Sequence, residues 1–174
     1  QSGGTIHCHG GILFGGTAAG NYSGTASWSM TGGTLYLGAG GLSEGTLSPA
    51  KAITLSGGTV GALANWTGTL PMTLGTINGD VTFQCADSGA SPFDITLTKP
   101  LTGEGGLKKT GGGKLTLSDG NSYSGTTVVS NGTLQIVTGA ILSNNGPVSL
   151  DGSAGSPVVS VQVTNAGQSW EIGT

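Results

Sequence analysis

The side chains best suited to acid-base chemistry are eight carboxylates, which are scattered along the chain. They are Glu44, Asp80, Asp87, Asp94, Glu104, Asp119, Asp151 and Glu171. Asp80, Asp87 and Asp94 are evenly spaced, with Lys99 as the nearest candidate base. Cleavage of a glycosidic bond needs two carboxylates at a fixed separation, and the sequence offers no obvious pair. We therefore expect solvated turn residues and no catalytic site, with a polysaccharide-degrading enzyme as an alternative.

The run His7, Cys8 and His9 is the one cluster of metal-binding residue types. In a strand, alternate side chains point to opposite faces, so both histidines would share one face and the thiol would lie on the other. A zinc site requires three or four converging ligands, and the sequence has no second His or Cys cluster to complete it. We expect surface histidines beside an inward cysteine, with no metal and no cofactor.

Cys8 and Cys85 are the two cysteines of the chain. If the chain folds as a regular solenoid of stacked β-strand coils, the two cysteines would lie about three or four coils apart, roughly 14 to 19 Å along the axis. A disulfide needs Cα atoms within about 7 Å. The sequence leaves two possibilities open. Either both are buried thiols, or a disulfide forms after the N-terminal strand folds back or pairs with another subunit.

Large aromatic residues offer flat faces on which sugar rings could stack. They are Trp28, Trp66, Trp170, Tyr22 and Tyr36. They lack a repeat spacing, so a role in covering the core is the simpler interpretation. A surface array of stacked threonine hydroxyl groups would need Thr-x-Thr segments at a constant spacing from coil to coil. Thr67-Gly68-Thr69 and Thr96-Leu97-Thr98 fit this pattern locally but do not recur regularly, so the sequence does not predict such an array.

Short alternating strands separated by glycine turns must position all of these groups. The chain contains 36 glycines and only 7% charged residues, and no long stretch keeps the helical period. Such short strands cannot bury their apolar faces alone, but stacked coils can, because each strand then pairs with the strands above and below. The pattern predicts an all-β fold with almost no helix, a right-handed parallel β-solenoid (β-helix).

The clearest repeat runs over residues 103–136. Its sequence is GEGGLKKTGGGKLTLSDGNSYSGTTVVSNGTLQI, in which Leu107, Leu115, Leu117, Val128, Val129, Leu134 and Ile136 supply the apolar positions. This segment resembles the passenger-associated repeat of bacterial autotransporters. The resemblance rests on Gly103, Gly105, Leu107, Lys109, Gly111, Gly113, Leu115, Leu117, Asn121, Tyr123, Gly125, Thr127, Val129, Gly132 and Leu134. It implies a secreted or cell-surface passenger, with Asn121 closing a turn and Tyr123 covering the edge of the core.

Asp119 departs from this repeat, because the family usually carries glycine at this position. We expect a turn that avoids positive φ or an aspartate that bonds its own backbone.

The length of 174 residues predicts a single domain over 1–174, since no charge run or proline-rich linker divides it. Roughly 20 to 30 residues per coil would give about six to nine coils and a rod of about 30 to 45 Å. The net charge of -3 and the absence of arginine argue against a nucleic acid partner. No apolar run is long enough to form a membrane-spanning helix.

The two ends of such a solenoid would present unpaired backbone groups, and the sequence shows no cap over them. The candidate polymerisation edges are Ile6, Cys8, Ile12, Leu13, Val159, Val161, Val163 and Trp170. A head-to-tail contact between copies does not close, so it would build a fibre. We expect a non-enzymatic extracellular structural solenoid that forms a homopolymer, with an adhesin that binds a glycan or host receptor as an alternative.

Overall fold

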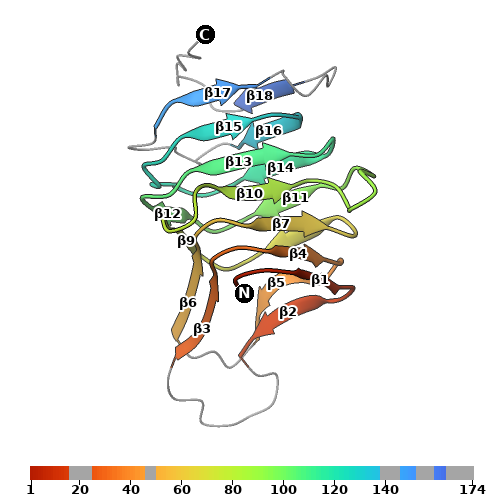
Figure 1. The fold of residues 1–174 in the computed structure, drawn as a ribbon, viewed down its shortest axis with the longest axis vertical. Coiled ribbons are helices and arrows are strands. Elements are labelled where there is room, and N and C mark those ends of the chain that lie inside the picture. Colours follow the sequence, from red (N-terminus) through yellow and green to blue (C-terminus); the bar gives the residue numbers. More distant parts are fainter. Residues whose placement is uncertain (16–24, 46–49, 138–145, 152–158, 164–174) are drawn as a thin grey trace.

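The computed structural model describes residues 1–15, 25–45, 50–137 and 146–151, together with the backbone of 159–163. Within these residues the fold is all-β, without a helix. The strands lie in three sheets, and every strand pairs in parallel with its neighbours. The expected parallel β-solenoid is therefore confirmed (Figure 1).

Two seven-stranded sheets and one four-stranded sheet form the sides of the solenoid. The first sheet contains β1 (Thr5–Cys8), β4 (Thr34–Leu37), β7 (Thr59–Ala62), β10 (Val81–Gln84), β13 (Leu107–Thr110), β15 (Thr127–Val129) and β17 (Val148–Leu150). The second contains β2 (Gly11–Phe14), β5 (Gly41–Glu44), β8 (Trp66–Gly68), β11 (Ile95–Leu97), β14 (Lys114–Leu117), β16 (Gly132–Ile136) and β18 (Val159–Val163). The third contains β3 (Thr25–Met30), β6 (Ala50–Leu55), β9 (Met72–Leu74) and β12 (Leu101–Gly103).

The seven strands of the first sheet correspond to seven coils, within the predicted range. Coil length is irregular. Thr5 pairs with Thr34 at the N-terminal end, whereas Leu107 pairs with Thr127 further along, so the repeat along this sheet shortens from 29 to 20 residues. Figure 1 shows β3 and β6 running together away from the stack, on the other side of the N-terminal coils from β2 and β5.

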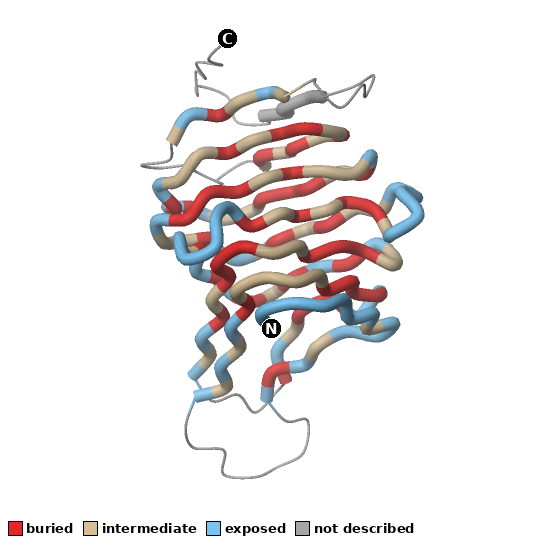
Figure 2. The backbone as a smooth tube through the Cα atoms, viewed as in Figure 1, coloured by how far each residue is buried: buried red, intermediate tan, exposed pale blue. Residues whose placement is uncertain are grey.

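Figure 2 shows buried and half-buried residues alternating along many of the strands. The buried positions of successive coils pair with one another, so mostly apolar residues form columns inside the coils. One column of the first sheet runs Ile6, Leu35, Val60, Phe83, Lys109, Val129 and Leu150. A column of the second runs Ile12, Leu42, Gly68, Leu97, Leu117 and Ile136, and the backbone of Val163 pairs with Ile136. The predicted interior positions of the clearest repeat are confirmed, except that Val128 lies half-buried between buried Thr127 and Val129.

After β12 the third side continues without a named strand. Ser122 and Ser124 donate backbone N–H groups to the carbonyl oxygens of Leu101 and Gly103, each at 2.9 Å. The Asn121 side chain supplies the acceptor that the Leu101 N–H requires, at 3.0 Å. Residues 121–124 therefore extend the third side by one further coil.

Candidate functional site

The N-terminal end of the solenoid is an edge made of β1, β2 and β3, which are the outermost strands of the three sheets. Ile6 and Leu13 are each 49% exposed there. No Lys, Arg, Asp or Glu occurs in residues 1–15 or 25–30. The edge therefore lacks the charged side chains that usually block strand addition.

The candidate edge residues of the N-terminal end differ in direction. Ile6 and Ile12 begin interior columns, and Cys8 pairs with buried Leu37. Leu13 pairs instead with half-buried Ser43 and lies on the outer face of the second sheet. Ile6, Cys8 and Ile12 thus occupy the inward-facing positions of the outermost coil at this end.

The C-terminal edge among the described residues consists of β17 and β18. Leu150 is 37% exposed on β17. The backbone of Val159, Val161 and Val163 lies in β18, where Val161 pairs with Leu134. Trp170 lies outside the described residues. The backbone of this edge therefore continues the same two sheets that begin at β1 and β2.

The two ends match each other in register. Ile6 and Leu150 are opposite ends of one interior column, and a second ladder of backbone pairs runs from Ile12 at one end to Val163 at the other. All pairs along both ladders are parallel. The C-terminal edge of one copy could therefore pair in parallel with the N-terminal edge of another and continue the same sheets.

Both cysteines are free thiols. Cys8 pairs with Leu37, and Leu37 pairs with Ala62. Cys85 lies at the next position of the register that pairs Gln84 with Gly61, so the two cysteines are three coils apart. Burial raises the pKa of the Cys85 thiol to about 12, against the opposing effect of the nearby Lys109 ammonium. Cys8 is half-buried, and its thiol donates to the Gly11 carbonyl oxygen at 3.5 Å.

Lys109 is a fully buried lysine that sequence reasoning treated only as part of the repeat motif. Its Nζ donates to the carbonyl oxygens of Thr110, Gly111 and Asn131 at 2.9, 2.6 and 2.8 Å. Burial lowers the pKa of Lys109, while Cys85 and Asp94 act against that shift. Strand alternation could have predicted this burial, because Lys109 is two residues after inward-pointing Leu107 and therefore faces the same side of the strand.

A Cβ on Gly132 would lie 2.9 Å from the Lys109 Nζ, and Gly132 has a φ of 71°. Glycine at this turn therefore leaves room for the ammonium and permits the left-handed backbone conformation. The lysine joins the turn of one coil to the turn of the next.

The run His7, Cys8 and His9 lies at the end of β1 and just after it. His7 and His9 are exposed around half-buried Cys8, and the His7 ring lies 5.1 Å from the Tyr36 ring. Among the described residues, no group of three His, Cys, Asp or Glu side chains could hold a metal ion.

Two of the evenly spaced aspartates bind backbone rather than each other. Asp87 Oδ1 accepts from the N–H groups of Gly89 and Ser91, each at 2.8 Å. Asp94 Oδ1 accepts from the Lys114 N–H at 2.8 Å. Asp87 thus stabilises its own turn and Asp94 links its coil to the start of β14 in the next, while Asp80 and Lys99 are exposed. Glu171 lies outside the described residues.

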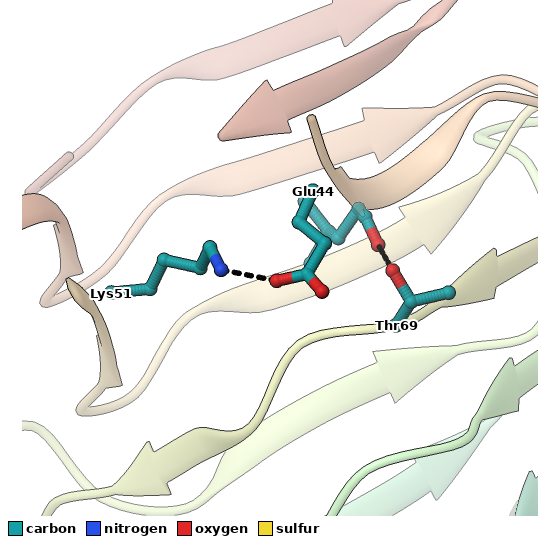
Figure 3. Close-up of polar contacts among 4 residues, drawn as sticks. Glu44, Lys51 and Thr69 are labelled. Atoms are coloured by element: carbon teal, nitrogen blue, oxygen red, sulfur yellow. Dashed lines mark hydrogen bonds and ion pairs between the residues drawn. The ribbon is translucent and has the colours of Figure 1, made fainter. Parts of the chain in front are cut away.

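Glu44 is an exception to the expectation of solvated turn carboxylates, because it ends β5 and pairs with Lys51 of β6. Figure 3 shows this ion pair next to Thr69, whose hydroxyl donates to the Leu42 carbonyl oxygen at 3.5 Å. The Glu44 side chain is 50% exposed, so the pair contributes at most about 1 kcal/mol. It links the second sheet to the third near the N-terminal end.

The described aromatic residues serve the fold. Trp66 is 3% exposed and donates its Nε1–H to the Gly61 carbonyl oxygen at 3.2 Å. Tyr36 is also buried, and half-buried Trp28 packs against the core. Tyr22 lies outside the described residues. Stacking of a sugar on Trp66 or Tyr36 would therefore require these side chains to move.

The turn residues of the repeat have the structural roles that the resemblance implied. The Tyr123 hydroxyl lies 2.6 Å from the Thr127 hydroxyl, and the tyrosine ring is fully buried within the core. The Asn121 side chain also donates to the Asp119 carbonyl oxygen, closing the turn. Asp119 Oδ1 accepts the Gly120 N–H at 2.8 Å, so the aspartate does bond its local backbone.

Comparison with known proteins places the repeat in a family. Residues 107–136 match the family described as passenger-associated-transport-repeat. No curated protein and no solved structure matches the chain. Within the described residues, no helix has the length and hydrophobicity needed to cross a membrane. Residues 107–136 are therefore an autotransporter passenger repeat, and their presence indicates an autotransporter passenger domain.

Proposed function

We propose that the chain is a non-enzymatic structural module of a passenger, and that copies of it stack head to tail into a fibre. The passenger repeat suggests a secreted or cell-surface location. The observation that carries the proposal is the match between the two ends, since Ile6 and Leu150 terminate the same interior column. A second copy would continue that column without changing the direction of any strand.

The energetic argument for stacking combines backbone and apolar groups. A strand added to an open edge gains the backbone hydrogen bonds of a parallel ladder. It also buries Ile6, which is 49% exposed, against Leu150, which is 37% exposed. Full burial of an exposed aliphatic side chain contributes about 1.5 to 3 kcal/mol, so burying what remains exposed of Ile6 and Leu150 contributes about 1 kcal/mol each. No Lys, Arg, Asp or Glu side chain on the N-terminal edge strands opposes such a contact.

The register of the junction follows from the columns. If Leu150 of one copy lies over Ile6 of the next, then Ser149 lies over Thr5. Directly paired residues of neighbouring strands are about 4.8 Å apart at Cα, which suits a disulfide. His7 is two residues further along β1, so its Cα would lie about 8 Å from that of Ser149, which is too far.

The test is disulfide cross-linking in a chain that carries Cys8→Ser. The pair Thr5→Cys and Ser149→Cys should give ladders of covalent oligomers under mild oxidation. The matched pair His7→Cys and Ser149→Cys should give few. Equal cross-linking by both pairs would reject this register, and no oligomers with either pair at high protein concentration would reject the stacking itself. The adhesin would then become the leading alternative.

A further inference from the structure

Asn78 and Gly79 form an exposed turn between β9 and β10. Gly79 has a φ of 84°, and no atom lies within 4 Å of the position that a Cβ would take there. Within the described part of the chain, the Gly79 N–H has no hydrogen-bond acceptor. An asparagine followed by an unhindered glycine is the sequence most prone to cyclise on its own backbone.

The same dipeptide occurs at Asn131-Gly132 and at Asn145-Gly146, whose asparagine lies outside the described residues. The first of these sites contrasts with the exposed turn. Asn131 is half-buried, and Gly132 is buried at the start of β16. A Cβ on Gly132 would lie 2.4 Å from the Gly113 carbonyl oxygen, so this glycine is enclosed by the preceding coil. Attack by its backbone nitrogen would require the ladder to open locally. Asn131-Gly132 is therefore an internal control for the exposed turn.

The Asn78 side chain also joins two coils. Its Nδ2 donates to the Thr31 carbonyl oxygen, which lies 47 residues earlier. Asn78 packs directly on Gly57, where a Cβ would lie 2.9 Å from the Asn78 Cβ. The amide thus stabilises the corner at which the third coil stacks on the first two.

We propose that Asn78 is a site of spontaneous deamidation, with water as the co-reactant. The Gly79 nitrogen attacks Cγ of Asn78 and forms a new C–N bond, while the bond from Cγ to Nδ2 breaks and ammonia leaves with the amide proton. Water then opens the cyclic imide at either carbonyl group. The products are aspartate and isoaspartate, so the amide donor to Thr31 is replaced by an anionic oxygen that faces a carbonyl oxygen.

This exchange weakens the corner in two ways. The Thr31 carbonyl oxygen loses its donor, and the new carboxylate adds a negative charge beside Asp80. Isoaspartate also lengthens the main chain at a turn that packs on Gly57. The modification is independent of the proposed stacking of copies.

The experiment is peptide mapping of the folded chain during incubation at mildly alkaline pH. Conversion at Asn78 should be at least about tenfold faster than at Asn131, because the enclosed Gly132 nitrogen can attack only after local opening. Equal rates at the two sites, or an unchanged Asn78 after the unfolded chain has converted, would overturn the proposal.

The effect of deamidation on stability is tested by comparing two aspartate variants. Asn78→Asp should lower the thermal midpoint by about 2 to 4 °C, the shift that the loss of one inter-coil contact produces in a domain of this size. Thr76→Asp adds the same charge to the same exposed turn and leaves the Asn78 amide in place. Equal midpoints for the two variants would contradict the role of Asn78 in joining the coils.

Discussion

The Nζ of Lys109 donates a 2.8 Å hydrogen bond to the carbonyl oxygen of Asn131, which lies in the turn of the following coil. This contact places a charged side chain in a column that is otherwise apolar. It is tolerated because backbone carbonyl groups surround the ammonium.

Lys109→Ala should destabilise the fold by about 2 to 5 kcal/mol, because buried carbonyl groups lose their donor and a cavity forms. Lys108→Ala is the matched control, since Lys108 is half-buried and of opposite parity, and it should change stability by less than about 0.5 kcal/mol. Urea denaturation of both variants measures the difference. Equal losses would show that the hydrogen bonds of Lys109 contribute nothing specific.

Alkaline pH should reduce stability through Cys85. Burial raises the pKa of its thiol from 9.0 to about 12, so the unfolded chain releases this proton at lower pH than the folded chain. The stabilisation is complete below pH 9 and is lost progressively towards pH 12, at up to about 1.4 kcal/mol per pH unit. The lowered pKa of Lys109 acts in the opposite direction.

Comparing the native chain with Cys85→Ala isolates the contribution of the Cys85 thiol to the pH dependence of stability. Between pH 9 and pH 10 the native chain should lose stability relative to this variant. Tyr123 contributes at higher pH, because burial raises the pKa of its hydroxyl from 10.0 to about 12. Parallel stability curves for the two chains over this interval would argue against a shifted thiol pKa.

Gly61→Ala should disturb the first sheet, because a Cβ there would lie 2.4 Å from two atoms of the Tyr36 ring. The expected cost is about 1 to 3 kcal/mol, as the ring must leave its position over β7. Gly10→Ala is the control, since no atom lies within 4 Å of its Cβ position. A fluorescence or near-ultraviolet dichroism signal from Tyr36 should change only in the first variant.

Asn121→Ala should cost about 1 to 3 kcal/mol, because the buried N–H of Leu101 loses its acceptor. Ser122→Ala lies next to it on an exposed position and keeps its backbone hydrogen bond, so it should be nearly neutral. Hydrogen exchange at the Leu101 amide gives a direct reading. Unchanged protection in Asn121→Ala would mean that another group supplies the acceptor.

Ile6→Lys should prevent association, because it places a charge at the end of an interior column. Leu13→Lys is a matched control, since both residues are 49% exposed but Leu13 points to the outer face. Sedimentation velocity over a range of concentrations distinguishes them. Association of the Ile6→Lys variant at native strength would contradict the assigned junction.

Much of the interior could be predicted from alternation alone. Leu115, Leu117 and Leu134 fall at period-two positions between glycine turns, and all three are fully buried. Alternation also places Lys109 inside, but the usual exposure of lysine hides this until its acceptors are visible. Those acceptors are main-chain carbonyl groups, which carry no sequence signature.

The stacking of the threonines could not be predicted, because the coil length is not constant. Thr67 pairs with Thr96, 29 residues later, whereas Thr96 pairs with Thr116, 20 residues later. A fixed period therefore misses the column. The Asn78 contact was hidden for a similar reason, since its acceptor is a backbone oxygen of Thr31 in another coil.

The most direct test of head-to-tail stacking is electron microscopy of the purified chain across a range of concentrations. The seven coils formed by the described strands, spaced about 4.8 Å apart, give an axial repeat of about 34 Å per copy. We predict unbranched filaments with this repeat, and their loss in Ile6→Lys but not in Leu13→Lys. Discrete monomers at every concentration would contradict the account.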